Sequence, residues 1–193
     1  MKKRKFVVTL LLLATVFSLV SVSALADDTD VTRAQVGFID GELEFEGNAG
    51  TGGMNINFGL NHALPVGEQT YIPVDGDHSL MVRDAKSGAD NWQVEGKLGN
   101  FVSTAPANTF QATITLTDGT PDSGLVTTTT PIDLVSGANA VLIMTGTGTL
   151  VDDYATKWLE ADIVLAFDAT NAATIVEPAT YSADMTWTLT SMP

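Results

Sequence analysis

Apolar and polar residues alternate with a period of two along most of the chain after residue 40. The clearest stretch is 110–116, where Phe110, Ala112, Ile114 and Leu116 alternate with Gln and Thr. Similar alternation runs through 42–46 and 54–58. Because successive side chains of a strand point to opposite faces, this pattern predicts half-buried β-strands. The frequent Thr, Val and Ile also favour strands.

Turn-forming dipeptides separate the predicted strands: Asp40-Gly41, Asp75-Gly76, Asp118-Gly119 and Ser136-Gly137. Many short strands divided by turns are typical of an all-β sandwich or barrel. We therefore predict an all-β protein with a single-domain β-sandwich, Ig-like or related, and keep a barrel as the alternative. The domain is expected to occupy residues 35–193.

Alternation also assigns the three tryptophans to faces. Trp92 and Val94 share the face opposite Gln93 and Glu95, which predicts that they point into the core. In the last segment, Trp187 and Leu189 fall on the apolar face that begins at Tyr181. These four residues are therefore expected to stabilise the fold.

Trp158 is expected to differ. If 157–167 is one strand, the apolar face carries Leu159, Ile163 and Phe167, and Trp158 falls on the polar face with Glu160 and Asp162. An aromatic ring among carboxylates on an exposed face suits sugar stacking or a protein contact. Trp158, Glu160 and Asp162 are thus a candidate binding surface. The alternatives are a covering loop or a β-bulge that switches the face.

The N-terminal residues resemble a secretory signal peptide. Lys2–Lys5 form a basic start, an apolar run covers 6–20, and Ala24-Leu25-Ala26 is a suitable cleavage site. We therefore expect a signal peptide at 1–26, an acidic mobile lead at 27–34, and a secreted protein. The apolar run is shorter than the roughly 20 residues of a membrane-spanning helix.

Charge excludes some partners. The chain has 9 Lys and Arg against 23 Asp and Glu, and removal of the signal peptide leaves 5 basic residues and a formal charge of −18. Nucleic-acid binding depends on Lys and Arg that neutralise phosphates, so no nucleic-acid partner is expected. Anionic wall polymers such as teichoic acids are also expected to be repelled at low salt, unless divalent cations bridge the charges. The chain has no cysteine, and a domain of this length needs no disulfide to fold.

Catalytic and metal-binding signals are weak. The two histidines are His62 and His78, and Ser79 follows His78, but neighbouring strand residues point apart and cannot form a nucleophile–base pair. An enzyme and a cofactor are therefore not expected. Asp75, Asp77 and His78 form the best metal-like cluster. Asp-Gly is chiefly a turn signal and the rest of a calcium loop is missing, so a plain turn is favoured.

Four stretches resemble the WxL family of cell-wall-binding proteins. They are Gly41–Phe45 with Asn57-Phe58-Gly59, Leu80–Asp84 leading to Trp92-Gln93-Val94, Phe110–Leu116, and Tyr181–Leu189 with Trp187-Thr188-Leu189. Together they cover roughly residues 35–193. The first W-x-L copy has Val94 in place of Leu, and the loop after Asp84 lacks the Arg-Gly often found there in the family.

The resemblance implies a small WxL protein of a Gram-positive cell surface. Such a protein would associate non-covalently with the cell wall through peptidoglycan. It would also assemble with other WxL proteins and with membrane-anchored WxL-interacting proteins. The leading hypothesis is therefore a non-catalytic module for peptidoglycan binding and surface-complex assembly. The alternative is a structural partner that binds those proteins and contacts the wall only indirectly.

Overall fold

The computed structural model describes residues 43–46, 54–60, 62–86, 90–148, 152–177 and 179–192. All of them belong to one compact unit, Ile39–Pro193. The expected signal peptide (1–26), the acidic lead (27–34) and the Asp40-Gly41 turn lie outside the described residues. Within the described ranges, no helix is long and apolar enough to cross a membrane.

The strands form four antiparallel sheets. In spatial order, sheet A contains β1 (Leu43–Glu46), β3 (His78–Asp84), β12 (Asp152–Trp158) and β8 (Thr120–Pro121). Sheet B contains β10 (Ile132–Val135), β7 (Thr113–Leu116), β13 (Ile163–Phe167) and β2 (Gln69–Tyr71). Sheet C contains β14 (Met185–Met192), β4 (Asn91–Leu98), β11 (Val141–Thr147) and β9 (Val126–Thr128). Sheet D pairs β5 (Phe101–Thr104) with β6 (Ala107–Phe110).

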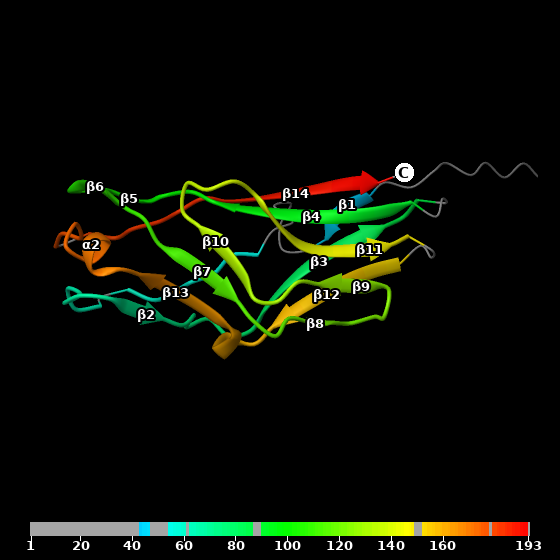
Figure 1. Ribbon diagram of the computed structural model, residues 1–193, viewed down its shortest axis with the longest axis horizontal. Coiled ribbons are helices and arrows are strands. Elements are labelled where there is room, and N and C mark those ends of the chain that lie inside the picture. Colours follow the sequence, from blue (N-terminus) through cyan, green and yellow to red (C-terminus); the bar gives the residue numbers. More distant parts are fainter. Residues whose placement is uncertain are drawn as a thin grey trace, which may run out of the picture. The chain divides into compact units, whose positions relative to one another are not determined.

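Two of these sheets face each other across the core. Trp92 of sheet C and Tyr154 of sheet A have ring centroids 5.8 Å apart. Each layer then continues into a second sheet, because β4 leads into β5 and β12 leads through the 3₁₀-helix η2 (Glu160–Asp162) into β13 (Figure 1). The short helix α2 (Ala169–Ala172) follows β13. Sheets B and D and helix α2 thus lie at one end, and sheet A lies toward the other (Figure 1).

The all-β prediction is confirmed. The described part of the chain consists of antiparallel sheets packed around a common core, and none of those sheets closes into a barrel. The arrangement is that of a β-sandwich, and the barrel alternative is wrong. The predicted turns at Asp75-Gly76 and Ser136-Gly137 are also present, with positive φ of 92° at Gly76 and 73° at Gly137.

Period-two alternation matches the observed burial at both W-x-L-like segments. Trp92 and Val94 are completely buried. Trp187 and Leu189 are half-buried and pack against the core, because β14 is the edge strand of sheet C. In that sheet Leu189 lies opposite Val94.

Each tryptophan ring packs over a glycine. Trp187 lies opposite Gly96 on the neighbouring strand, and a Cβ placed on Gly96 would be 2.9 Å from its ring. Trp92 lies opposite Gly146, where a Cβ would overlap the indole. A Cβ on Gly119 would lie 2.6 Å from Nε1 of Trp158. Each indole therefore fits because the residue beneath it is glycine and has no side chain.

The predicted exposure of Trp158 is wrong, since the residue is completely buried. The prediction assumed one continuous strand over 157–167. Instead β12 ends at Trp158, η2 intervenes, and β13 begins at Ile163. The inward face before the break is Tyr154, Thr156 and Trp158, and after it Ile163, Leu165 and Phe167. The interruption shifts the alternation by one residue, which exposes Leu159 and buries Trp158.

Candidate functional site

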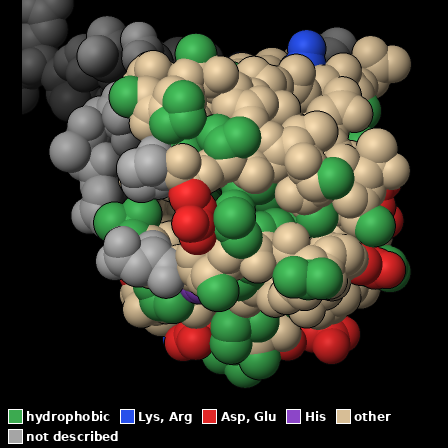
Figure 2. All heavy atoms as spheres, turned by 90° about the vertical axis from the view of Figure 1, so that its left-hand side faces the viewer, with side chains coloured by type: hydrophobic (Ala, Val, Ile, Leu, Met, Phe, Trp, Pro, Cys, Tyr) green, Lys and Arg blue, Asp and Glu red, His purple; other side chains and the backbone are tan. Residues whose placement is uncertain are grey.

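A cavity of about 950 Å³ opens at the end of the molecule where sheets B and D meet. We call it the end cavity. Its walls come from the segment 56–65, β2, β5, β13 and the segment 175–185. Figure 2 shows apolar side chains gathered around a hollow on this face. Its size is within the usual range for ligand-binding pockets.

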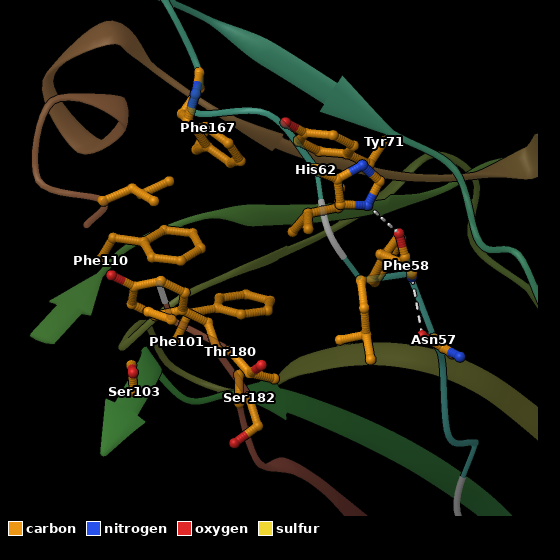
Figure 3. Close-up of a pocket in the computed structure, with 18 of the residues that line it drawn as sticks. Asn57, Phe58, His62, Tyr71, Phe101, Ser103, Phe110, Phe167, Thr180 and Ser182 are labelled. Atoms are coloured by element: carbon orange, nitrogen blue, oxygen red, sulfur yellow. Dashed lines mark hydrogen bonds between the residues drawn. The ribbon is translucent and has the colours of Figure 1, made fainter. Parts of the chain in front are cut away.

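Aromatic rings form a continuous chain along the wall of the end cavity (Figure 3). His62 and Tyr71 have ring centroids 4.4 Å apart, and Tyr71 stacks on Phe167 at 5.8 Å. Phe167 meets Phe110 at 5.3 Å. Phe110 in turn contacts Phe101 and Tyr181, each at 5.0 Å. Six residues from six separate segments thus build one aromatic surface.

The strands dictate where several of these rings lie. Phe101 and Phe110 are directly opposite in the β5–β6 pair, so their side chains stack on one face. Tyr71 lies two strands from β7 in sheet B, beside β13, where its partner in register is Leu165. Both Leu165 and Phe167 point inward from β13 and line the end cavity.

The segment 54–62 is held over the end cavity by hydrogen bonds. The carbonyl of Asn57 accepts from the backbone N–H of Val74 at 2.8 Å, and its side chain accepts from the N–H of Gly59 at 2.9 Å. Gly59 has a φ of 86°, a conformation that favours glycine. His62 Nε2 lies 2.7 Å from the carbonyl oxygen of Phe58. These contacts fix Phe58 and His62 against the wall.

Helix α2 joins β13 to the segment 175–185, both of which line the end cavity. Asp168 caps this helix by accepting from the backbone N–H of Asn171 at 2.7 Å, and the Asn171 side chain accepts from the N–H of Gln111 at 2.9 Å. Hydrogen bonds from Asn171 and Thr170 lower the pKa of Asp168. Further along, the Tyr181 hydroxyl accepts from the N–H of Val176 at 3.1 Å. The segment that carries Tyr181 is thereby tied to its own preceding loop.

The lining of the end cavity also includes polar side chains, of which Asn57, His62 and Tyr181 are hydrogen-bonded to the protein. Ser103 is an exception, because its hydroxyl is buried and has no hydrogen-bond partner among the described residues. Glu177 is the one carboxylate among the described lining residues, which include no Lys or Arg. The site therefore combines aromatic and aliphatic surface with hydroxyl groups, and its charge is slightly negative.

Aliphatic side chains are also exposed at the end cavity, beside polar residues such as Glu177 and Thr180. Leu60 is 66% exposed, Leu64 is 45% exposed and Val176 is 36% exposed, and all three line it. Large aliphatic side chains that are this exposed beside a cavity are typical of a surface that binds a ligand or another protein.

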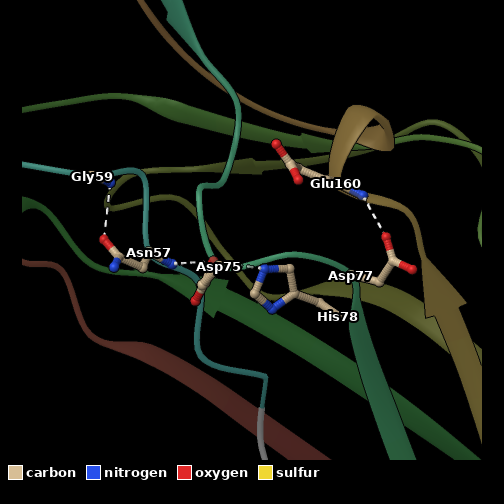
Figure 4. Close-up of polar contacts among 6 residues, drawn as sticks. All are labelled: Asn57, Gly59, Asp75, Asp77, His78 and Glu160. Atoms are coloured by element: carbon tan, nitrogen blue, oxygen red, sulfur yellow. Dashed lines mark hydrogen bonds and ion pairs between the residues drawn. The ribbon is translucent and has the colours of Figure 1, made fainter.

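The structure does not combine the metal-like cluster of the sequence into one site (Figure 4). Oδ1 of Asp75 lies 3.1 Å from Nε2 of His78 and accepts from the N–H of Asn57 at 3.3 Å. Asp77 instead accepts from Nζ of Lys157 at 2.8 Å and from the N–H of Glu160 at 3.2 Å. Those two bonds lower the pKa of Asp77. Within the described ranges, no three His, Asp or Glu residues are placed to hold a metal ion.

The candidate surface of Trp158, Glu160 and Asp162 does not form either. Trp158 points into the core, whereas Glu160 and Asp162 belong to η2. Asp162 accepts from the backbone N–H of Leu159 at 3.3 Å, which closes the turn that joins β12 to β13. Their role in the fold is to connect two sheets.

Sequence reasoning did not predict the end cavity. Its aromatic residues are spread along the sequence from Phe58 to Tyr181, and they come together only in the folded structure. The sequence offered one signal. Leu60 and Leu64 lie in the segment 59–65, which contains Gly and Pro and shows no alternation of apolar and polar residues. Apolar residues in such a loop are poor candidates for a sheet core.

The fold and the end cavity define a β-sandwich protein with an aromatic-lined pocket between two of its sheets. Comparison with models of known protein families, with curated proteins and with solved structures finds no match for this chain.

Proposed function

We propose that this chain is a non-catalytic assembly module of a Gram-positive cell surface, and that it binds another surface protein through the end cavity. The observation that carries the proposal is the aromatic cavity with exposed leucines at its mouth. The secretory character of the N-terminal residues supports an extracytoplasmic location. The resemblance to WxL proteins supports a wall-associated complex with other WxL proteins or WxL-interacting proteins.

Catalysis has little basis in the end cavity. A hydrolytic site needs a nucleophile in contact with a base. Nε2 of His62 is engaged with the Phe58 carbonyl, and no serine of the described residues is hydrogen-bonded to a histidine. The residues around the cavity are suited to holding a ligand by contact.

Direct binding to peptidoglycan is the second candidate. Trp158 was its proposed contact, and the burial of that ring leaves the end cavity as the aromatic surface that a wall ligand would use. Sugars carry many hydroxyls, each of which needs a polar partner when it leaves water. Leu60, Leu64 and Val176 expose aliphatic surface at the mouth, which suits the apolar side chains of a protein partner better than a glycan.

Sedimentation with wall material tests the proposal. The protein is purified from the culture medium of a bacterial host and mixed with two preparations of Gram-positive wall. One preparation retains its surface proteins, and the other is peptidoglycan stripped of proteins and teichoic acids. Wild type is compared with Tyr71→Ala in the end cavity and with Leu159→Ala, an exposed residue outside it.

Wild type and Leu159→Ala are expected to sediment with the protein-bearing walls, whereas Tyr71→Ala is expected to stay in solution. Circular dichroism checks that every variant is folded. Retention on stripped peptidoglycan as strong as on the complete wall would replace the protein partner with direct wall binding. Failure to sediment with either preparation, or equal retention of Tyr71→Ala, would contradict a role for the end cavity at the wall.

A further inference from the structure

The chemistry of the end cavity also points to a class of ligand. We propose that the end cavity binds an extended polypeptide segment that carries aliphatic or aromatic side chains with Lys or Arg beside them. This inference rests on the proposed function, in which a protein partner uses the cavity. It adds the chemical nature of the segment that enters.

The apolar part of the segment follows from the walls and the mouth. Phe58, Tyr71 and Phe167 offer ring surface inside, and Leu60 and Leu64 extend the apolar surface outward into solvent. A ligand that covers both regions removes more apolar area from water than one that fills the cavity alone. A chain segment with several consecutive apolar side chains meets this requirement.

The charge of the segment follows from what surrounds it. Among the described lining residues Glu177 is the one acidic side chain, and no Lys or Arg is present. The whole chain has a formal net charge of −14. A free fatty acid or a phosphorylated ligand would bring its anion to a site that offers no basic side chain to pair with it. Lys or Arg next to the apolar residues would instead be attracted by the acidic surface.

Ser103 provides an independent reason to expect a peptide. Its side chain is 2% exposed, lines the end cavity, and has no hydrogen-bond partner among the described residues (Figure 3). A hydroxyl can both donate and accept. A peptide backbone offers an N–H and a C=O at every residue, so an entering segment can satisfy the hydroxyl with either group. A hydrocarbon chain could satisfy it with neither.

Isothermal titration calorimetry with three synthetic nine-residue peptides tests the inference. The first peptide has five alternating Leu and Phe residues between two lysines at each end. The second has the same apolar residues between glutamates. The third keeps the lysines around five alternating Ser and Thr residues. Dodecanoate below its micelle concentration and vesicles of phosphatidylcholine provide the lipid arms.

We expect the lysine-flanked apolar peptide to bind, and the glutamate-flanked peptide to bind at least about tenfold more weakly. No binding of the polar peptide is expected. The double variant Leu60→Ala/Leu64→Ala should weaken binding about tenfold or more, whereas Leu159→Ala should bind as wild type does. Leu159 is the matched control, because it is 54% exposed and does not line the cavity.

Several outcomes would overturn the inference. Equal binding of the polar peptide would reduce the effect to general charge attraction, and equal binding of the glutamate-flanked peptide would contradict the charge argument. Dodecanoate or vesicles that displace the bound peptide would make the site one for lipids. If no peptide binds but wall retention still depends on Tyr71, the ligand class is wrong and the proposed function stands. If the peptide binds but complete walls retain nothing, the ligand class is right and the proposed function is wrong.

Discussion

Trp92 of β4 lies directly opposite Gly146 of β11, and its indole occupies the space that any side chain at position 146 would need. Trp187 and Gly96 repeat this relationship on the other side of β4. Both tryptophans thus belong to cross-strand pairs in which the ring covers the backbone of a glycine. In this chain the W-x-L-like segments serve the packing of sheet C.

Gly146→Ala should therefore destabilise the protein. The added methyl group would overlap the ring of Trp92, which is completely buried, contacts Tyr154 and cannot move freely. Overpacking of this kind costs about 1–3 kcal/mol. Urea unfolding would measure the loss. Gly124→Ala is the control, because a Cβ at Gly124 meets nothing within 4 Å, and it should leave the stability within about 0.5 kcal/mol of wild type.

Trp158→Ala is expected to lower the free energy of unfolding by about 3–5 kcal/mol, as truncation of a buried Trp does. Trp158→Phe should cost less, since the indole N–H has no partner among the described residues to lose. Thermal unfolding of both variants beside Leu159→Ala tests this. A Trp158→Ala protein as stable as wild type would contradict the burial of the ring and return Trp158 to the surface.

Ser103 and Ser136 form a second matched pair. Both are buried, but the Ser136 hydroxyl accepts from the backbone N–H of Ala112 at 3.1 Å, whereas that of Ser103 has no partner among the described residues. Ser136→Ala should cost about 1–3 kcal/mol, because the N–H is left unpaired. Ser103→Ala should be neutral or slightly stabilising. Chemical denaturation distinguishes them, and a similar loss in both would mean that Ser103 has a partner in solution.

The lowered pKa of Asp77 predicts a dependence of stability on pH. Its carboxylate is stabilised by Lys157 and by the N–H of Glu160 in the folded state. This contribution is complete above the unfolded pKa of about 3.9 and is lost as the pH falls through the lower folded value. Asp77→Asn should therefore melt below wild type at pH 7 and approach it below pH 3. Glu68→Gln, at an exposed position, should show no such convergence. A constant difference at both pH values would contradict the assignment.

The sequence was sufficient to predict the sheets and the inward faces of their unbroken strands. Alternation alone places Trp92 and Trp187 correctly, because β4 and β14 run without interruption through those residues. It fails at Trp158, where the strand ends. A period of two holds no information about where one strand stops and the next begins. Here the face of β13 is predicted correctly at Ile163 and Phe167, and extending it back across the break reverses the assignment of Trp158.

The end cavity could not be predicted for another reason. Phe110 reads as an ordinary inward residue, and so do Phe167 and Tyr181. That their rings meet depends on how sheet B, sheet D and the segment that carries Tyr181 pack against one another, which is a property of the folded molecule. The exposed leucines at positions 60 and 64 acquire meaning only after that packing is known.

The strand pairings have a consequence for how the chain folds. β3 pairs with β12, and β4 pairs with β14, so each pair joins strands that are far apart in the sequence. Closing such long loops costs entropy before any contact compensates for it, and proteins dominated by distant pairings fold in milliseconds to seconds. Throughout that interval the backbone groups along β4 lack the neighbour that β14 later provides. The pairing of β14 with β4 is therefore expected to be a slow step of folding, during which the chain is most prone to aggregate.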